Sequence, residues 1–129
     1  MRAGCLAPVM AVLLLGCTDA SCPPLASSRM QVAELFFGRN AIDDAMWASF
    51  AADTLSEQFP DGFTVLDGRG QWRAGPASAI VREPSTLVIV AAPDTPATRE
   101  RLAAVIEAYR TRFAQQSVGL VMGNACAAF

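Results

Sequence analysis

The sequence predicts an α+β domain in which two helices cover one face of a four-stranded antiparallel sheet. Two stretches carry apolar residues at three- and four-residue spacing, which is typical of amphipathic helices. Four other runs have the composition and bounding turns of strands. The segments follow one another in the order β-α-β-β-α-β, and this order allows two split β-α-β units with right-handed crossovers.

The first expected strand is 31–37 (QVAELFF), which ends at Gly38. The next segment, 41–59, is expected to be helical, with Asp43 or Asp44 as its N-cap. Its apolar stripe consists of Trp47, Phe50, Ala51, Leu55 and Phe59. Pro60-Asp61-Gly62 ends this helix.

The second expected strand begins with FTVL (63–66). The glycines that flank Arg69 predict a turn or bulge at 67–70 with positive φ, after which 71–73 resume the same ribbon. If the turn at 74–79 sets the register of the hairpin, Gln71 lies opposite Arg82.

The third expected strand contains Ile80-Val81 and the apolar run 87–92 (LVIVAA), on either side of Pro84. Because proline has no amide donor, we expect Pro84 at a bulge or at a sheet edge. The continuous apolar run predicts a central strand that helices cover on one face.

The second helix is expected to start with Thr95 as N-cap and Pro96 in the first turn. Its apolar stripe consists of Leu102, Val105, Ile106, Tyr109 and Phe113. We expect Tyr109 in the core with its hydroxyl on a polar partner. Residues 117–122 alternate as a last strand, which completes a ferredoxin-like βαββαβ arrangement with spatial strand order 4-1-3-2.

The N-terminus predicts an export signal at 1–16. Arg2 is followed by a ten-residue apolar stretch, Leu6 to Leu15, which suits a signal peptide and is too short to span a bilayer. Leu14-Leu15-Gly16-Cys17 resembles the lipobox of bacterial lipoproteins, which implies cleavage before Cys17 and fatty acylation (palmitate) of that residue. The alternative is an ordinary signal peptide with a chance cysteine. A tether at 17–29 then precedes a single domain at 30–129. The expected location is the cell envelope, on the outer membrane facing the periplasm in a bacterium with two membranes.

Two further cysteines flank the expected domain. Cys22 precedes the first strand and Cys126 follows the last one, and the predicted topology brings these two strand ends together. Export to an oxidising compartment permits a disulfide between them. The alternative is two unrelated free thiols.

Composition excludes several kinds of chemistry. The chain has no histidine, so it can build no Ser-His-Asp triad and no imidazole metal site. Its net charge of −2 argues against nucleic-acid binding. We expect no metal, no cofactor and no catalytic residues.

Several longer motifs carry a family resemblance: ELFFGR (34–39), FPDGFTVLDGRGQWR (59–73), VREPSTLVIV (81–90), YRTRFAQQSV (109–118) and the terminal Phe129. Together they resemble the domain of unknown function 3574 family, over the whole expected domain from about residue 32. The resemblance implies small secreted or lipid-anchored bacterial proteins with no established activity.

The densest polar cluster falls on the hairpin of the second and third strands. Its members are Asp61, Asp67, Arg69, Gln71, Arg73, Arg82 and Glu83. One interpretation is a site for a carboxylate or another anion, since guanidinium groups bind such ligands bidentately. The other is a solvated, charge-paired face that protects an edge strand from aggregation.

Three functional hypotheses follow. The first is a non-enzymatic accessory domain that binds an envelope protein or a small anionic ligand. The second is a small enzyme without cofactor that uses the polar cluster. The third is a structural module that pairs through its sheet as a homodimer.

Overall fold

The computed structural model describes residues 21–129. The expected signal segment, the lipobox with Cys17 and the start of the tether lie outside the described residues. The elements are a 3-10 turn (Pro24–Ala26), β1 (Ser28–Gly38), α1 (Asp44–Phe50), a π-helical segment (Ala51–Leu55), α2 (Ser56–Gln58), β2 (Thr64–Trp72), β3 (Val81–Pro93), α3 (Pro96–Phe113) and β4 (Gly119–Ala127). No helix in this part of the chain is both long and apolar enough to cross a membrane.

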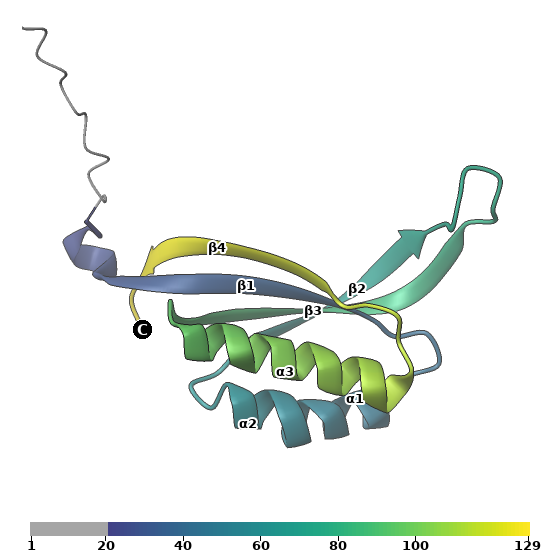
Figure 1. Ribbon diagram of the computed structural model, residues 1–129, viewed down its shortest axis with the longest axis horizontal. Coiled ribbons are helices and arrows are strands. Elements are labelled where there is room, and N and C mark those ends of the chain that lie inside the picture. The colour runs from purple at the N-terminus through teal and green to yellow at the C-terminus, as the bar shows by residue number, and fades with distance from the viewer. Residues whose placement is uncertain (1–20) are drawn as a thin grey trace, which may run out of the picture.

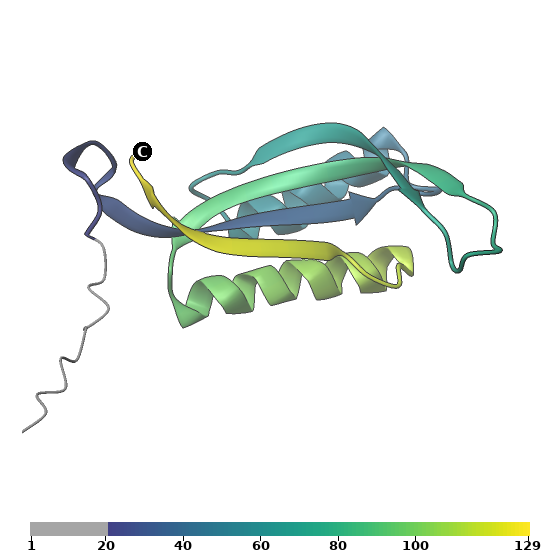
Figure 2. The same ribbon diagram turned by 90° about the horizontal axis from the view of Figure 1, so that it is seen from above.

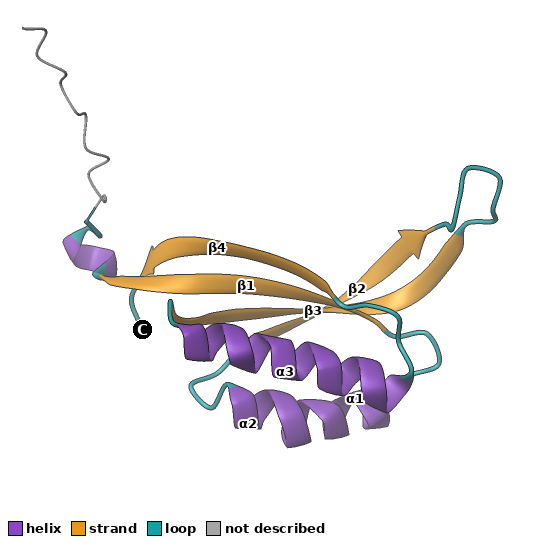
Figure 3. Ribbon diagram, in the orientation of Figure 1, coloured by secondary structure: helices purple, strands orange, loops and turns teal. Residues whose placement is uncertain are grey.

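The strands form one antiparallel sheet in the order β2-β3-β1-β4 (Figure 1). This is the predicted order 4-1-3-2 counted from the other edge, so the α+β ferredoxin-like prediction is confirmed. The helices α1, α2 and α3 lie on one side of the sheet, and no helix covers the other side in the described part of the chain (Figure 3).

The core fills the space between the sheet and its helices. Alternate residues of β1 point into it, and Ala33, Leu35 and Phe37 are all buried. Phe50 and Tyr109 lie against Phe37 with ring centroids 6.1 and 4.7 Å away in edge-on geometry. The expected helical stripes therefore meet in an aromatic cluster under β1.

The first helix runs from Asp44 to Gln58 with a π-helical segment in its middle. Phe50 and Leu55 are five residues apart, and both are fully buried. A π-helical turn is wider than an α-helical turn, so it keeps both side chains on the face toward the sheet.

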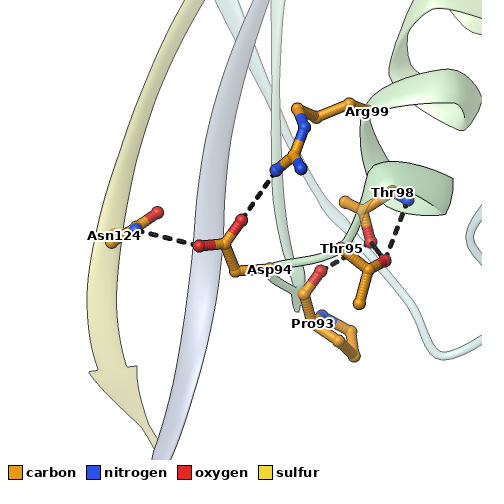
Figure 4. A network of polar contacts seen from close by, with 6 residues as sticks. All are labelled: Pro93, Asp94, Thr95, Thr98, Arg99 and Asn124. Atoms are coloured by element: carbon orange, nitrogen blue, oxygen red, sulfur yellow. Dashed lines mark hydrogen bonds and ion pairs between the residues drawn. The ribbon is translucent and has the colours of Figure 1, made fainter.

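Both helices begin at the expected caps. The Asp43 carboxylate accepts from the Met46 amide at 2.8 Å, and the Thr95 hydroxyl accepts from the Thr98 amide at 3.2 Å. Next to Thr95, Asp94 accepts from Arg99 and from Asn124 of β4 (Figure 4). These contacts fix the loop between β3 and α3 to the edge strand.

Two strand predictions and the expected place of Cys126 need correction. No turn or bulge occurs at 67–70: β2 pairs with β3 without interruption from Thr64 to Trp72, and neither Gly68 nor Gly70 has a positive φ. The continuous ladder with β3 therefore decides the conformation of these glycines. The last strand is also longer than 117–122, because β4 pairs with β1 as far as Ala127, and Cys126 lies within it.

Pro84 lies where β1 ends, in agreement with its expected place at an edge. Pairing of β1 with β3 stops at Gly38 and Ser85. The next residue, Arg39, donates its amide to the Pro84 carbonyl at 2.8 Å, and its own carbonyl accepts from Ile42 at 3.1 Å. Because the Arg39 carbonyl accepts from Ile42, it does not need the backbone amide hydrogen that Pro84 lacks.

Cys22 and Cys126 are joined in a disulfide, with their Cα atoms 5.4 Å apart. Their separation along the chain is 104 residues. The bond ties the segment before β1 to β4, the edge strand that pairs with β1.

Candidate functional site

The β2–β3 hairpin extends beyond the rest of the sheet. We define the arm as residues 69–84, the part of the hairpin that lies past the end of β1. Within it β2 and β3 pair only with each other. Figure 2 shows the arm projecting from the end of the domain that is remote from the N-terminal segment.

Strand alternation divides the polar residues of the arm between two faces. Gln71 lies opposite Arg82, which confirms the register expected from the turn at 74–79. Arg69, Gln71 and Arg82 share the face on the helix side of the sheet, because Val65 on that side pairs with the buried Val88. These three side chains form what we call the arginine face.

The arginine face is not neutralised within the described part of the chain. Arg69 and Arg82 are exposed, and neither forms an ion pair with a carboxylate among residues 21–129. A hollow of about 600 Å³ runs along the strands here, lined by 68–71 and 82–84. Arg69 and Arg82 are therefore solvated, without a carboxylate partner among these residues.

Other members of the predicted cluster lie elsewhere. Glu83 is on the opposite face of β3, where its carboxylate lies 3.0 Å from the position of a Cβ built on Gly38. Arg73 follows the end of β2 and donates to the Pro76 carbonyl at 3.3 Å. Asp61 precedes the far end of β2 and lines a different hollow.

Arg39 is the functional candidate that the polar cluster missed. Its side chain is buried, and its guanidinium bonds Asp44 at 2.6 Å and lies 3.9 Å from Asp67. The same group lies over the Trp47 ring at 5.7 Å. The sequence signal was its place at the end of ELFFGR, directly after the first strand.

Asp67 lies at the base of the arm, near Arg39. It lies on the same side of β2 as Arg69, two residues before it. Its largely exposed carboxylate lies 3.9 Å from the Arg39 guanidinium, a long contact beside the much closer Asp44. Asp67 and Arg69 are not paired with each other.

Tyr109 connects α3 to the same end of β1. Its hydroxyl donates to the Gly38 carbonyl at 2.7 Å, which agrees with the expected core tyrosine with a polar partner. The pKa of Tyr109 is raised to about 12: burial is the main cause, the Arg39 guanidinium acts in the opposite direction, and the Glu83 carboxylate adds to the increase. The phenol is therefore a structural hydrogen-bond donor at neutral pH.

No cluster of three or more cysteine or carboxylate side chains suited to a metal ion occurs among residues 21–129. The chemistry that this end of the molecule offers is recognition of an anion by guanidinium and amide groups.

Comparison by sequence gives a family. The model of a family described as protein of unknown function (DUF3574) matches residues 32–129. The chain belongs to the DUF3574 family. No curated protein matches it in sequence.

Solved structures resemble this DUF3574 chain in fold. A phage SAM lyase in complex with S-methyl-5'-thioadenosine has a TM-score of 0.60 at 17% identity, over 76% of this chain and 83% of the lyase chain. CutA from Synechococcus elongatus PCC7942, complexed with Bis-Tris, has a TM-score of 0.53 at 10% identity, over 81% of this chain and 87% of the CutA chain. At these identities the likeness concerns the fold alone.

Proposed function

We propose that this DUF3574 chain is a lipid-anchored binding protein of the bacterial envelope whose arm binds carboxylate groups of a protein partner. One observation carries the proposal: Arg69 and Arg82 share one face of a projecting hairpin and have no carboxylate partner in the described chain. Guanidinium groups bind carboxylates through two parallel hydrogen bonds, and Gln71 between them adds amide groups.

The segment at Cys22, five residues after the proposed anchor, and the arm lie at opposite ends of the domain. The lipobox resemblance supports anchoring through Cys17, five residues before the disulfide at Cys22. β1 then runs 11 residues toward the base of the arm, which is about 36 Å for an extended strand. An anchor at the first end would hold the arm away from the membrane surface (Figure 1), where a partner can reach it.

The enzymatic alternative has weaker support. It requires Arg69, Arg82, Asp67 and Glu83 in one pocket. Glu83 lies on the other face of the strand; Asp67 shares the face of Arg69, but its carboxylate is 3.9 Å from Arg39. The fold shared with a phage SAM lyase adds no support, because at 17% identity the likeness concerns the fold alone.

In-cell crosslinking of the full-length chain tests the proposal. We place a photoreactive amino acid at Gln71, between the two arginines, and a second one at Glu100, which is exposed on α3, as a control position. We expect crosslinks from position 71 that the double substitution Arg69→Glu, Arg82→Glu removes. Arg101→Glu, which reverses one exposed arginine on α3, is the matched control and should leave them intact. Unchanged crosslinks in the arm double variant would contradict the proposal.

The anchor has its own test. Labelling of cells with a tagged fatty acid should mark the wild-type chain, and Cys17→Ser should remove the label and release the chain from membranes. An unlabelled wild-type chain would contradict this part of the proposal and leave the arm untouched.

A further inference from the structure

A second hollow lies on the face of the sheet that no helix covers, at the end remote from the arm. Its volume is about 530 Å³, which is within the range of small-molecule sites. The pairing of the strands explains it: β3 continues to Pro93, but β2 begins only at Thr64, opposite Ile89. Beyond Ile89 the sheet therefore has no strand on the outer side of β3, and residues 61–63 of the loop before β2 line the space instead.

This hollow, which we call the end hollow, has a mostly apolar lining. Its apolar side chains include Met30, Phe63, Ile89, Ala91 and Phe129. Asp61 is the one charged side chain among its described lining residues. An apolar ligand therefore fits the end hollow better than a polar one.

The charge around the end hollow disfavours a free fatty acid. Glu34 lies opposite Ile89 in the register, on the same face of the sheet as the hollow. By strand alternation, none of the positions of the four described strands on this face holds an arginine. A carboxylate head group would meet Asp61 and Glu34 without a cation from these strands, so the ligand that fits is an apolar chain without a negative head group.

The segment before β1 is held at the same end of the sheet. Cys22 is bonded to Cys126, and Cys126 pairs with Arg29, the residue before Met30 of the hollow. Cys17 precedes Cys22 by five residues, which is a reach of at most about 18 Å. The disulfide therefore keeps the proposed acylation site close to an apolar hollow.

We propose that the end hollow holds an acyl chain carried by Cys17. This inference rests on the proposed function, which supplies the lipid, and it gives that lipid a second location besides the membrane. A chain in ester or amide linkage is apolar along its length and brings no carboxylate to Asp61. Burial in the hollow removes its methylene groups from water, as insertion into a bilayer does. The hollow and the membrane thus compete for one chain, and the hollow shelters it where no membrane is present.

Photocrosslinking tests where the chain lies. Cells receive a fatty acid with a photoreactive group at its end, and the full-length chain is purified, transferred to detergent-free buffer and irradiated. Mass spectrometry should find the lipidated N-terminal peptide joined to peptides that contain Phe63 or Ile89. Ala91→Trp, which fills the hollow, should remove these adducts. Val121→Trp, at an exposed position outside the hollow, is the matched control and should keep them.

Binding of an added probe tests the source of the chain. The probe is the methyl ester of a fluorescent palmitate analogue, and full-length Cys17→Ser provides a hollow without a chain of its own. We expect saturable binding to Cys17→Ser and at least about tenfold weaker binding to the acylated wild type. Lost burial of two methylene groups already corresponds to about tenfold in affinity. Adding Ala91→Trp to Cys17→Ser should weaken binding by the same factor, and adding Val121→Trp should not.

The outcomes separate this inference from the proposed function. Thr64→Trp fills the hollow from an exposed position and replaces Ala91→Trp if that variant lacks the near-UV circular dichroism of the wild type. Adducts that map away from the hollow, no binding of the ester to Cys17→Ser, equal binding to the acylated wild type, or tighter binding of the free acid would each overturn the inference. A fatty-acid label on the wild type together with any of these results leaves the anchor intact. An unlabelled wild type would contradict the anchor and the inference together.

Discussion

The stability of the domain above pH 9 depends on Tyr109, the one tyrosine of the chain. Its ring is fully buried, its hydroxyl bonds the Gly38 carbonyl, and burial raises its pKa from 10.0 to about 12. The chain contains no lysine, so few other groups titrate between pH 10 and 12. A change of stability in this interval therefore reports on one phenol.

The sign and size follow from the two pKa values. Below pH 10 the phenol is protonated in both the folded and the unfolded chain, so its full contribution is present. Between pH 10 and 12 the unfolded chain loses the proton and the folded chain retains it, so the free energy of unfolding falls. The total loss is about 3 kcal/mol for two pKa units, and about half of it has occurred at pH 11.

Urea unfolding at pH 9 and pH 11 measures this loss in the wild type and in Tyr109→Phe. We expect the wild type to lose about 1.4 kcal/mol between the two pH values. The variant should change much less over this interval. At pH 9 it should already be about 1–3 kcal/mol less stable than the wild type, because it leaves the Gly38 carbonyl without its donor.

Tyrosinate absorbance provides the independent check. It should appear near pH 12 in the folded chain and near pH 10 in urea. Equal pH dependence in the wild type and Tyr109→Phe, or tyrosinate absorbance at pH 10 in the folded chain, would refute the assignment of this titration to a buried phenol.

Three further predictions concern the core, a cap and the disulfide. Phe50→Ala removes a ring within about 6 Å of four other aromatic rings and should cost about 3–5 kcal/mol in urea unfolding; a cost below about 1 kcal/mol would contradict its place in the core. Thr95→Ala should cost about 1 kcal/mol, whereas Thr95→Asp, which retains a capping oxygen, should cost less. The double substitution Cys22→Ser, Cys126→Ser opens a loop of 104 residues and should cost up to about 4.7 kcal/mol; dithiothreitol should destabilise the wild type and leave this variant unaffected.

Periodicity predicted the parts of the fold that depend on one-sided burial. Phe50 and Leu55 marked the sheet-facing side of the first helix, and Thr95 marked the start of the second. Gly68 and Gly70 were misinterpreted because glycine indicates a turn only when no neighbouring strand determines the backbone. Here β3 pairs with β2 on both sides of them, so extended pairing prevails.

The candidate site was predicted in part, for a related reason. Sequence proximity grouped Arg82 with Glu83, although neighbours in a strand point to opposite faces; alternation alone could have separated them. Asp61 lies far from the arm because β2 runs without interruption from Thr64 to Trp72, and the sequence did not reveal this length. Burial of Arg39 could not be predicted, because it depends on how the start of the first helix closes over the end of β1.

Arg39 links these observations, because its guanidinium lies near both Asp44 and Asp67 at the base of the arm. Burial of a guanidinium is costly unless carboxylates approach it, and Asp44 and Asp67 do so here. Asp67 lies two residues from Arg69 on the same face of β2. Without Arg39, Arg69 would be the cation nearest to Asp67 along the strand. Arg39 thus leaves Arg69 available to a partner's carboxylate. We expect Arg39→Met to weaken the crosslinks from position 71 in a chain with both arm arginines intact, and unchanged crosslinks would contradict this role of Arg39.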